Sequence, residues 1–505
     1  MIASHTAPDQ PSALEPLVQE LAAYVRQAAT AATPAHDVER GIWTRILAVG
    51  RQALELFFRL NGTGDIGETV ALPDGQTARR LPDTHTRAYR SVFGDFTLRR
   101  TVYGTRAGQK IAFVPLDARL QLPAGDYSYL LQQWDQALGC ESAFARVGVT
   151  LFDVLGLKQS TDSLERMNRQ MAQAVHSFRM ARPVPTAADE GEVMVAQADG
   201  KGVVMRRPAD EPKIHGHRTK GQKANRKRMA AVGAIYSVGR VVRTPADVVA
   251  SLFRDPATDR PAPAATRPRP VGKHVWASLT YERDGITVPG TDLVFAWLSV
   301  ELGRRNPGGR REVVYLMDGQ EALWEARRAY LPGTNAVEVL DLLHVTPRLW
   351  AAAHLFHREG SADAVAFVRD RLERVLSGQV VSVVRGLRQM GTRRRLGGAK
   401  RKRLGTICGY LAKNAPRMRY GEYLARGYPI ASGVIEGACR HYVKDRLERA
   451  GMHWTRAGAQ AMLDVRSEFL NGDWEAFQQF RIERETKRLY PQRPVLDQVA
   501  WALAA

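Results

Sequence analysis

The chain has 505 residues and carries 73 Lys and Arg against 52 Asp and Glu, a formal net charge of +21. This excess favours a polyanionic partner, because each neutralised phosphate releases counterions and adds affinity, although a basic protein of the ribosomal type has the same balance. No uninterrupted apolar run reaches about 18 residues and the start has no signal-peptide pattern, so we expect a cytoplasmic protein without a membrane partner. Three cysteines, Cys140, Cys408 and Cys439, have no paired spacing, which argues against a disulfide framework.

The N-terminal part is predicted to be mainly helical with one β-hairpin. Helical periodicity covers residues 14–27 and 42–60, and alternating β-branched and aromatic residues surround Gly94 and Asp95. The arginines of this hairpin alternate with aromatic side chains, a pattern that suits a nucleic-acid backbone and equally suits a solvated basic face.

Two further helices are predicted at residues 144–155 and 163–175, and Ser160 or Thr161 is placed to cap the second. Short helices joined by a tight turn are typical of a helix-turn-helix that enters a major groove, and also of any helical bundle. Pro183 and Pro185 then mark the boundary to a second domain.

The second domain opens with an apolar segment that leads into Asp199-Gly200. This pair predicts a tight turn, with residues 203–207 as the returning strand and residues 229–238 as the third strand. A strand end is a rigid place for a carboxylate, so Asp199 is a candidate metal ligand as well as an ordinary turn residue. The arrangement recurs at Asp318-Gly319, after another apolar run.

The densest positive segment of the chain follows Asp199 and is predicted to be a loop beside it. Such a loop can be merely solvated, but its place next to a candidate site favours contact with a phosphate backbone. A His-x-His pair within it, His215 and His217, lacks the further ligands of a metal site. The DNA contacts expected here are Lys201, Lys213, Arg218, Lys220, Lys223, Arg226, Lys227 and Arg228.

A proline-rich stretch, residues 255–272, is interpreted as a linker, after which strands and helices alternate. This alternation predicts a mixed sheet with helices on its faces. Residues 364–428 are almost purely helical and basic in the middle, and Arg401, Lys402 and Arg403 are further candidate DNA contacts. Ser432 is then placed to cap a helix that carries Glu436.

The order of these elements is that of a ribonuclease-H-like fold, in which one carboxylate lies on the central first strand, one ends the adjacent strand and one comes from a late helix. Asp199, Asp318 and Glu436 occupy these places. Clustered carboxylates repel one another, so such a trio is expected to hold Mg²⁺ or Mn²⁺. Two ions about 3.5 to 4 Å apart promote in-line phosphoryl displacement, which predicts phosphodiester cleavage or transfer.

On the predicted helix around Glu436, Arg440 and Lys444 follow at spacing four and are placed to hold a phosphate backbone. For an isolated motif, a surface ion pair between Glu436 and Arg440 is the simpler interpretation. The apolar stripe of the same helix consists of Ile435, Cys439, Tyr442, Val443 and Leu447.

Four blocks of sequence resemble the ISKra family of bacterial insertion-sequence transposases, and the resemblance extends from about residue 89 to about residue 482. It implies an Asp-Asp-Glu transposase, similar to mutator-type enzymes in having an all-helical insertion before the glutamate. Asp199, Asp318 and Glu436 would be its metal-binding triad, and Asp341 and His344 its accessory Asp-x-x-His motif. The blocks are Ala198-Asp199-Gly200-Lys201-Gly202-Val203, Met317-Asp318-Gly319, Asp341-Leu342-Leu343-His344 and Ser432-Gly433-Val434-Ile435-Glu436-Gly437-Ala438-Cys439-Arg440-His441.

The resulting prediction is a metal-dependent transposase that acts on double-stranded DNA, both the element ends and the target, as a homodimer or larger oligomer in the bacterial nucleoid. Two alternatives are a ribonuclease-H-like nuclease without strand transfer and a catalytically inactive DNA-binding protein. The predicted domains are an N-terminal DNA-end-binding region (1–185), a mixed α/β catalytic core in two parts (190–360 and 431–472), a helical insertion (361–430) and a helical tail (473–505).

Overall fold

A computed structural model describes residues 14–105, 111–206, 227–253, 268–331, 333, 336–449, 451–499 and 501. The chain divides into two compact units, one combining Met1–Ala174 with Trp474–Ala505 and the other formed by Val175–Asp473. Among the described residues, no helix has the length and apolar character needed to cross a membrane.

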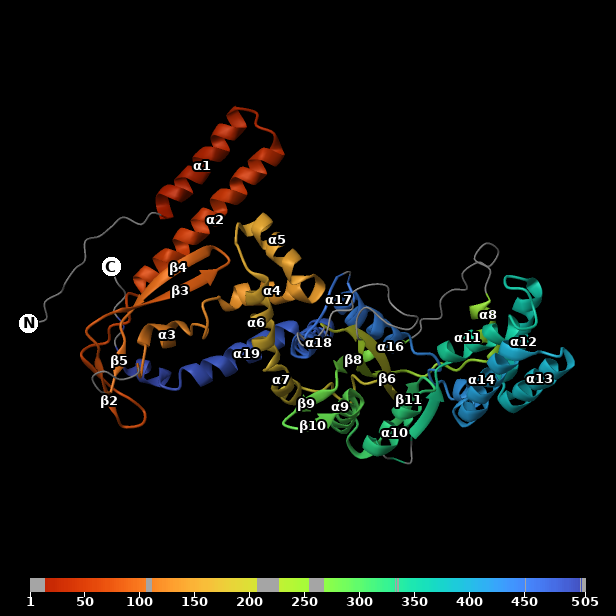
Figure 1. Ribbon diagram of the computed structural model, residues 1–505. Helices are drawn as coiled ribbons and strands as arrows, with labels where there is room; N and C mark the ends of the chain where they lie inside the picture. The colour runs from red at the N-terminus through yellow and green to blue at the C-terminus, as the bar shows by residue number, and fades with distance from the viewer. Residues whose placement is uncertain are drawn as a thin grey trace, which may run out of the picture. The chain divides into compact units, whose positions relative to one another are not determined.

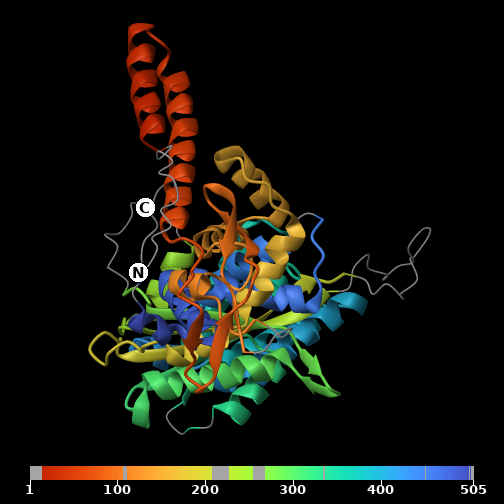
Figure 2. The same ribbon diagram turned by 90° about the vertical axis from the view of Figure 1, so that its left-hand side faces the viewer.

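The first unit begins with two long helices, α1 and α2, that lie side by side (Figures 1 and 2). The hairpin predicted around Gly94 is confirmed: β3 and β4 pair from His85–Arg100 to Ser91–Gly94, and Gly94 has a φ of +116° that favours glycine. The elements of this unit are α1 (Leu14–Thr30), α2 (Ala35–Leu60), β1 (Thr69–Ala71), β2 (Thr77–Arg80), β3 (His85–Ser91), β4 (Gly94–Arg100), β5 (Tyr103–Gly104), α3 (Pro115–Leu120), α4 (Tyr129–Glu141), α5 (Phe144–Leu155), α6 (Thr161–Ala172), α19 (Trp474–Leu489) and η4 (Arg493–Gln498).

The two helices predicted in the middle of this unit are confirmed as α5, which has the predicted bounds, and α6, which runs from Thr161 to Ala172 and not to residue 175. Gly156 ends α5 in the left-handed conformation, and the Ser160 hydroxyl accepts a hydrogen bond of 3.2 Å from the Ser163 amide, which caps α6. Local capping chemistry therefore fixes these boundaries.

The second unit is built on a mixed five-stranded sheet with the order β12-β11-β6-β7-β8. Its first strand, β6, lies in the middle, parallel to β11 and antiparallel to β7, and β11 is parallel to β12. The elements are α7 (Val175–Ala181), β6 (Val193–Val204), β7 (Lys227–Val238), α8 (Pro245–Leu252), β8 (Val271–Ser278), β9 (Tyr281–Arg283), β10 (Ile286–Val288), α9 (Gly290–Arg305), η1 (Pro307–Gly309), β11 (Glu312–Met317), α10 (Glu321–Tyr330), β12 (Ala336–Leu340), α11 (Leu342–Ala353), α12 (Ala362–Leu376), α13 (Val380–Arg393), α14 (Gly398–Asn414), η2 (Ala415–Arg417), α15 (Tyr420–Ala425), α16 (Gly433–Gly437), the π-helix η3 (Ala438–Lys444), α17 (Asp445–Leu447) and α18 (Arg456–Leu470).

The turn predicted at Asp199-Gly200 is wrong. Strand β6 continues through both residues to Val204 and pairs with β7 over its whole length, and the connection between the two strands lies outside the described residues. A Cβ on Gly200 would lie 3.0 Å from the Met229 side chain, and one on Gly202 would lie 3.0 Å from the Lys227 side chain. The glycines thus make room for cross-strand neighbours instead of turning the chain.

Strand β8 also departs from the sequence interpretation, because Val271 and Gly272 belong to it although they were predicted to end a linker. Residue Gly272 has a φ of +56° and lies against the Arg305 side chain, so a glycine in a strand was mistaken for a loop.

The two faces of the sheet have separate apolar cores. Val193 and Val195 of β6 pack with the helices from α11 to α15, whereas Met194 and Ala196 pack with α9 and α10. Successive residues of a strand point to opposite faces, which explains the division. The helical block α12 to α15 shares one core with the sheet, so it is firmly joined to β6, which carries Asp199, and to β11, which leads into Asp318.

Candidate active site

Asp199 and Asp318 lie at the same level on neighbouring parallel strands. The last paired residues of β6 and β11 are Ala196 and Tyr315, and each aspartate lies three residues further on. Burial, followed by the negative charge of Asp199, raises the pKa of the Asp318 carboxyl, while the Gln320 amide and nearby positive charge lower it. The two carboxylates therefore interact electrostatically at one edge of the sheet.

Local hydrogen bonds fix the orientation of both aspartates. The Gln320 amide donates to Asp318 Oδ1 over 2.8 Å, and Trp324 Nε1 donates to the Asp318 carbonyl over 2.8 Å. Asp199 Oδ1 accepts from the Gly200 amide over 2.7 Å, and the Cys439 thiol lies 3.3 Å from Asp199 Oδ2 as a donor. Trp324 is fully buried, so the Asp318 segment rests on a rigid support.

Glu436 approaches the same strand on α16. The Ile435 amide, one residue earlier, donates to Gln197 Oε1 of β6 over 3.1 Å, and Cys439, three residues later, contacts Asp199. Burial and the charges of Asp199 and Glu436 raise the pKa of the Cys439 thiol, which keeps it protonated as a donor. The structure thus brings Glu436 to the end of β6 that carries Asp199.

The apolar stripe predicted for the Glu436 helix is confirmed, since all five of its residues are buried. The regular α-helix assumed there is wrong, because α16 passes into the π-helix η3 at Ala438. A π-helix uses i→i+5 hydrogen bonds, which the sequence pattern did not anticipate. Arg440 and Lys444 are both exposed on it.

Ser432 does not cap α16 as predicted. Its hydroxyl donates instead to Asp341 Oδ2, and its amide donates to Asp341 Oδ1 over 3.3 Å. Asp341 Oδ1 also accepts from the Leu343 amide over 2.9 Å and so caps α11. Burial raises the pKa of Asp341, which is only 1% exposed, and the Ser432 hydroxyl lowers it. Asp341 therefore ties the start of the Glu436 helix to the end of β12.

His344 lies on the first turn of α11, with Nε2 3.2 Å from Glu436 Oε1. Among the described residues, Asp341, His344 and Glu436 each offer one ligand atom within 4.8 Å of the others, a spacing compatible with a cation. Asp199 and Asp318 are not members of that group. Both carboxylate oxygens of Asp341 already accept hydrogen bonds, so His344 and Glu436 are more available than Asp341 as ligands for a cation.

Two residues that the sequence interpretation missed support the Asp318 segment. The Arg348 guanidinium, one turn after His344 on α11, lies 3.4 Å from the centre of the Tyr410 ring of α14. A Cβ on Gly319 would lie 2.4 Å from that ring, so Tyr410 packs directly on the residue after Asp318. The spacing of His344 and Arg348 on one helix face was the available signal.

The predicted DNA contacts are scattered over several elements. Lys227 and Arg228 are exposed at the start of β7, where Lys227 forms an ion pair with Glu448, and Lys201 on β6 is partly buried. Arg401, Lys402 and Arg403 are exposed on α14. The remaining predicted contacts lie outside the described residues: Lys213, Arg218, Lys220, Lys223 and Arg226.

No protein-family model and no curated protein sequence matches this chain. Among solved structures, it is similar to the Drosophila P element transposase strand transfer complex, with 10% sequence identity over 74% of this chain and 82% of that chain and a TM-score of 0.23. A TM-score this low assigns neither fold nor activity.

Proposed function

We propose that this chain is a DNA transposase of the Asp-Asp-Glu type, with Asp199, Asp318 and Glu436 as its catalytic carboxylates. The observation that carries the proposal is their convergence: two aspartates at the same level of adjacent parallel strands, and a glutamate whose helix is bonded to the first of those strands. Such a cluster suits phosphodiester chemistry on DNA.

The topology supports the ribonuclease-H-like interpretation of this unit. Strand β6 is central, with the antiparallel strand β7 on one side and the parallel strand β11 on the other. Helices α12 to α15 lie in the chain between α11 and the Glu436 helix, the place that an all-helical insertion of a mutator-like, ISKra-type transposase would take. The first unit would then bind the element ends.

The donor set fits a divalent cation. Mg²⁺ and Mn²⁺ prefer oxygen ligands, and a carboxyl whose pKa is raised by burial and by a neighbouring carboxylate is stabilised in its charged form by a cation. Asp199, Asp318 and Glu436 would hold the ions, and the positive charge of two such ions would stabilise the attacking and leaving oxygens of the phosphodiester.

Other residues orient these groups and the DNA. Asp341 positions the Glu436 helix through Ser432, and His344 contacts Glu436 directly. Arg440 and Lys444 are exposed beyond Glu436 and would bind phosphates of the strand being cut. Transposition joins two element ends, so we expect the active species to be a homodimer or a larger oligomer on DNA.

The test uses the full-length protein and a DNA fragment that carries the coding region with its flanks. Asp199→Asn, Asp318→Asn and Glu436→Gln should each abolish Mg²⁺-dependent cleavage and strand joining while DNA affinity is retained. Asp445→Asn, in the same helical segment and half-exposed, is the matched control and should remain active. Full strand joining by Asp199→Asn would overturn the mechanism.

The same assay separates the two alternatives. Metal-dependent cleavage without any joined product would favour a nuclease that uses the same carboxylates. DNA binding by the wild-type chain without metal-dependent cleavage of any substrate would favour an inactive DNA-binding protein.

A further inference from the structure

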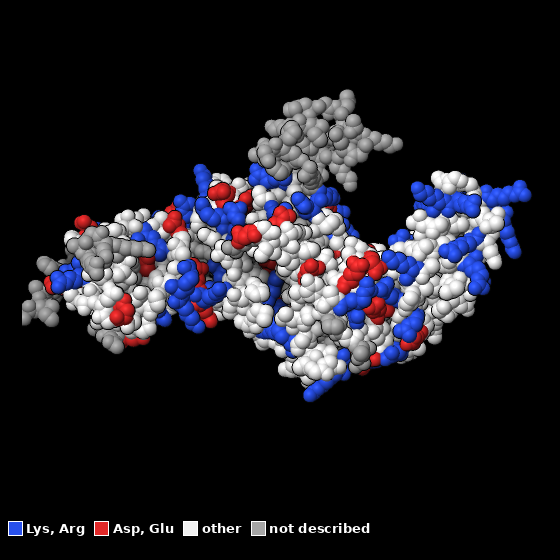
Figure 3. Space-filling model, turned by 60° about the horizontal axis from the view of Figure 1, so that its bottom comes forward, with Lys and Arg blue, Asp and Glu red and all other residues white. Residues whose placement is uncertain are grey.

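The helical hairpin formed by α13 and α14 has an unbalanced charge. Between Glu373 and Glu422 the sequence contains thirteen Lys and Arg and no Asp or Glu. In Figure 3, the right-hand end of the molecule, where Figure 1 places this block, shows Lys and Arg without interspersed acidic atoms. Like charges at this density repel one another, so the face is suited to an external polyanion.

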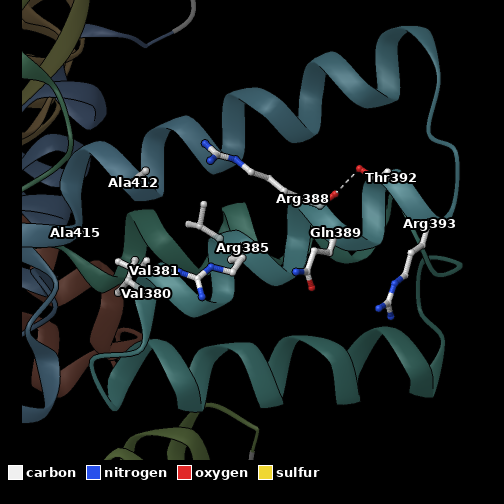
Figure 4. A pocket seen from close by; sticks show the side chains of 10 residues that line it. Val380, Val381, Arg385, Arg388, Gln389, Thr392, Arg393, Ala412 and Ala415 are labelled. Atoms are coloured by element: carbon white, nitrogen blue, oxygen red, sulfur yellow. Dashed lines mark hydrogen bonds between the residues drawn. The ribbon is translucent and has the colours of Figure 1, made fainter.

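The positive charge is gathered on one side of α13. Its buried stripe consists of Val380, Val383, Val384, Leu387 and Gly391. Arg385, Arg388 and Arg393 are exposed on α13, and they border a hollow of about 660 Å³ whose lining also includes Gln389, Thr392 and, from the stripe, Val380 and Val384 (Figure 4). Burial of the apolar stripe against the block thus obliges the three arginines to face outward.

These arginines differ in their ion pairs from the basic residues at the other end of the hairpin. Lys413 and Arg417, at the other end of the hairpin, form ion pairs with Glu321 and Glu338. Within the described ranges, no carboxylate lies at ion-pair distance from Arg385, Arg388 or Arg393. The basic residues that form ion pairs within the protein, Lys413 and Arg417, are therefore those whose partners lie beside the sheet. The arginines without such partners among the described residues border the hollow.

We infer that this face, Arg385, Arg388 and Arg393 with Lys400 to Arg403 at the start of α14, binds the phosphodiester backbone of duplex DNA. From Arg385 to Arg393 the helix rises about 12 Å, a distance over which one DNA strand presents about three phosphates. Guanidinium groups bind phosphate through paired hydrogen bonds. The hollow is thus long enough for one guanidinium on each of three phosphates.

Contacts with phosphates carry no sequence information. A transposase meets DNA of fixed sequence at its element ends and DNA of arbitrary sequence at the target, so the face is assigned to target DNA. This assignment rests on the proposed function. The position of the face agrees with it, because Arg403 and Tyr410 are separated by about 10 Å along α14 and Tyr410 packs on Gly319 beside Asp318.

The test compares two triple variants of the full-length chain by fluorescence anisotropy with a random-sequence DNA duplex and with an RNA duplex of the same length. Arg385→Gln/Arg388→Gln/Arg393→Gln should weaken DNA binding roughly tenfold, and the slope of log affinity against log salt should fall by up to about 2.7, or about 0.9 for each lost phosphate contact. The matched control is Arg269→Gln/Lys273→Gln/Arg310→Gln. It removes three exposed charges near the starts of β8 and β11, at the end of the sheet away from Asp318, and should change neither the DNA affinity nor the salt slope.

Equal losses in the two triple variants would overturn the site, and a loss confined to the RNA duplex would assign the face to RNA instead. In the strand-transfer assay, the α13 variant should lose joining to target DNA by a larger factor than cleavage at the ends. Equal losses of cleavage and joining would overturn the assignment to the target. Failure of the proposed function is seen separately, as activity of Asp199→Asn, because that variant leaves the α13 face intact.

Discussion

The two units of the molecule stabilise their helices in different ways. In the unit that contains the carboxylates, the helices from α12 to α15 share one apolar core with the central sheet. In the other unit the described cores are small, such as the cluster of Phe58, Phe96, Leu98 and Leu122, and helices α1 and α2 bury only Ala28 and Phe58. A substitution that disturbs the core of the second unit should therefore affect the candidate active site. A substitution in a small core of the first unit should affect only its immediate surroundings.

The largest effect is expected from a substitution that leaves a cavity in the core shared by the sheet and helices α12 to α15. Leu372 of α12 is fully buried, and Leu372→Ala should lower the free energy of unfolding by about 3 kcal/mol, because methylenes are lost and the rigid core cannot close the cavity. Urea unfolding measures the loss, and DNA cleavage should fall with it. Val365→Ala on the same helix, where the side chain is 39% exposed, is the control and should cost less than about 0.5 kcal/mol.

A buried acid in the other unit gives the next largest effect. Asp135 is fully buried on α4, its only described partner is Gln159 Nε2 at 2.9 Å, and burial raises its pKa from 3.8 to about 7. Between these values the folded protein binds more protons than the unfolded chain, so stability falls as pH rises toward 7 and is level above it. From pH 5 to pH 7 the expected loss is about 2 kcal/mol.

Hydrogen exchange of the α4 amides at the two pH values, corrected for intrinsic exchange, measures that loss within its own unit. Asp135→Asn should abolish the pH dependence, because an amide has no charge to bury. An unchanged pH dependence in Asp135→Asn would assign it to other groups. The amides of β6, in the other unit, should show no corresponding change.

The contact between the helical block and the Asp318 segment is tested more locally. A methyl group at Gly319 would overlap the Tyr410 ring at 2.4 Å, so Gly319→Ala should displace Asp318 and reduce cleavage about tenfold, or about 1.4 kcal/mol in activation free energy. Tyr410→Ala in the same chain removes the overlap and should restore part of the rate. Additive losses in this double-mutant cycle would contradict the contact.

The smallest effect is expected on the α1–α2 hairpin. Phe57 is 47% exposed and Trp43 is 44% exposed, so each side chain leaves close to half of its surface in solvent. Phe57→Ser should change the free energy of unfolding by less than about 0.5 kcal/mol. Phe58→Ser, the buried neighbour in contact with Tyr89 and Phe96, is the matched comparison and should cost several times more, as measured by urea unfolding.

Elements governed by local chemistry were predictable from the sequence. Residues Phe144–Leu155 form a helix with the predicted bounds, since the apolar periodicity ends at Gly156, and the hairpin turns at Gly94, where a positive φ is needed. Strand β11 ends just before Asp318, as its apolar run indicated. The mixed sheet likewise followed from the alternation of strands and helices.

Features decided by distant partners were not predictable. Gly200 and Gly202 resemble turn residues, and only the opposing side chains of β7 explain why the strand continues. The hydroxyl of Ser432 is taken by Asp341, which is 91 positions away in the chain, so the cap read from neighbouring residues is not formed. The metal-binding role of Asp199, Asp318 and Glu436 remains a prediction that the proposed variants test.

The π-helix that follows Glu436 has a consequence for how the protein tolerates length changes. The i→i+5 hydrogen bonds of a π-helix enclose one more residue than those of an α-helix. The direction in which the residues on either side of Ala438–Lys444 point therefore depends on how many residues this segment contains. Removing one residue there would replace the wider turn by an α-helical one and leave Glu436 close to its position relative to Tyr442, whose hydroxyl donates to the Leu463 carbonyl. A single deletion in this segment should therefore be tolerated better than a single insertion, which would lengthen a turn that is already wide.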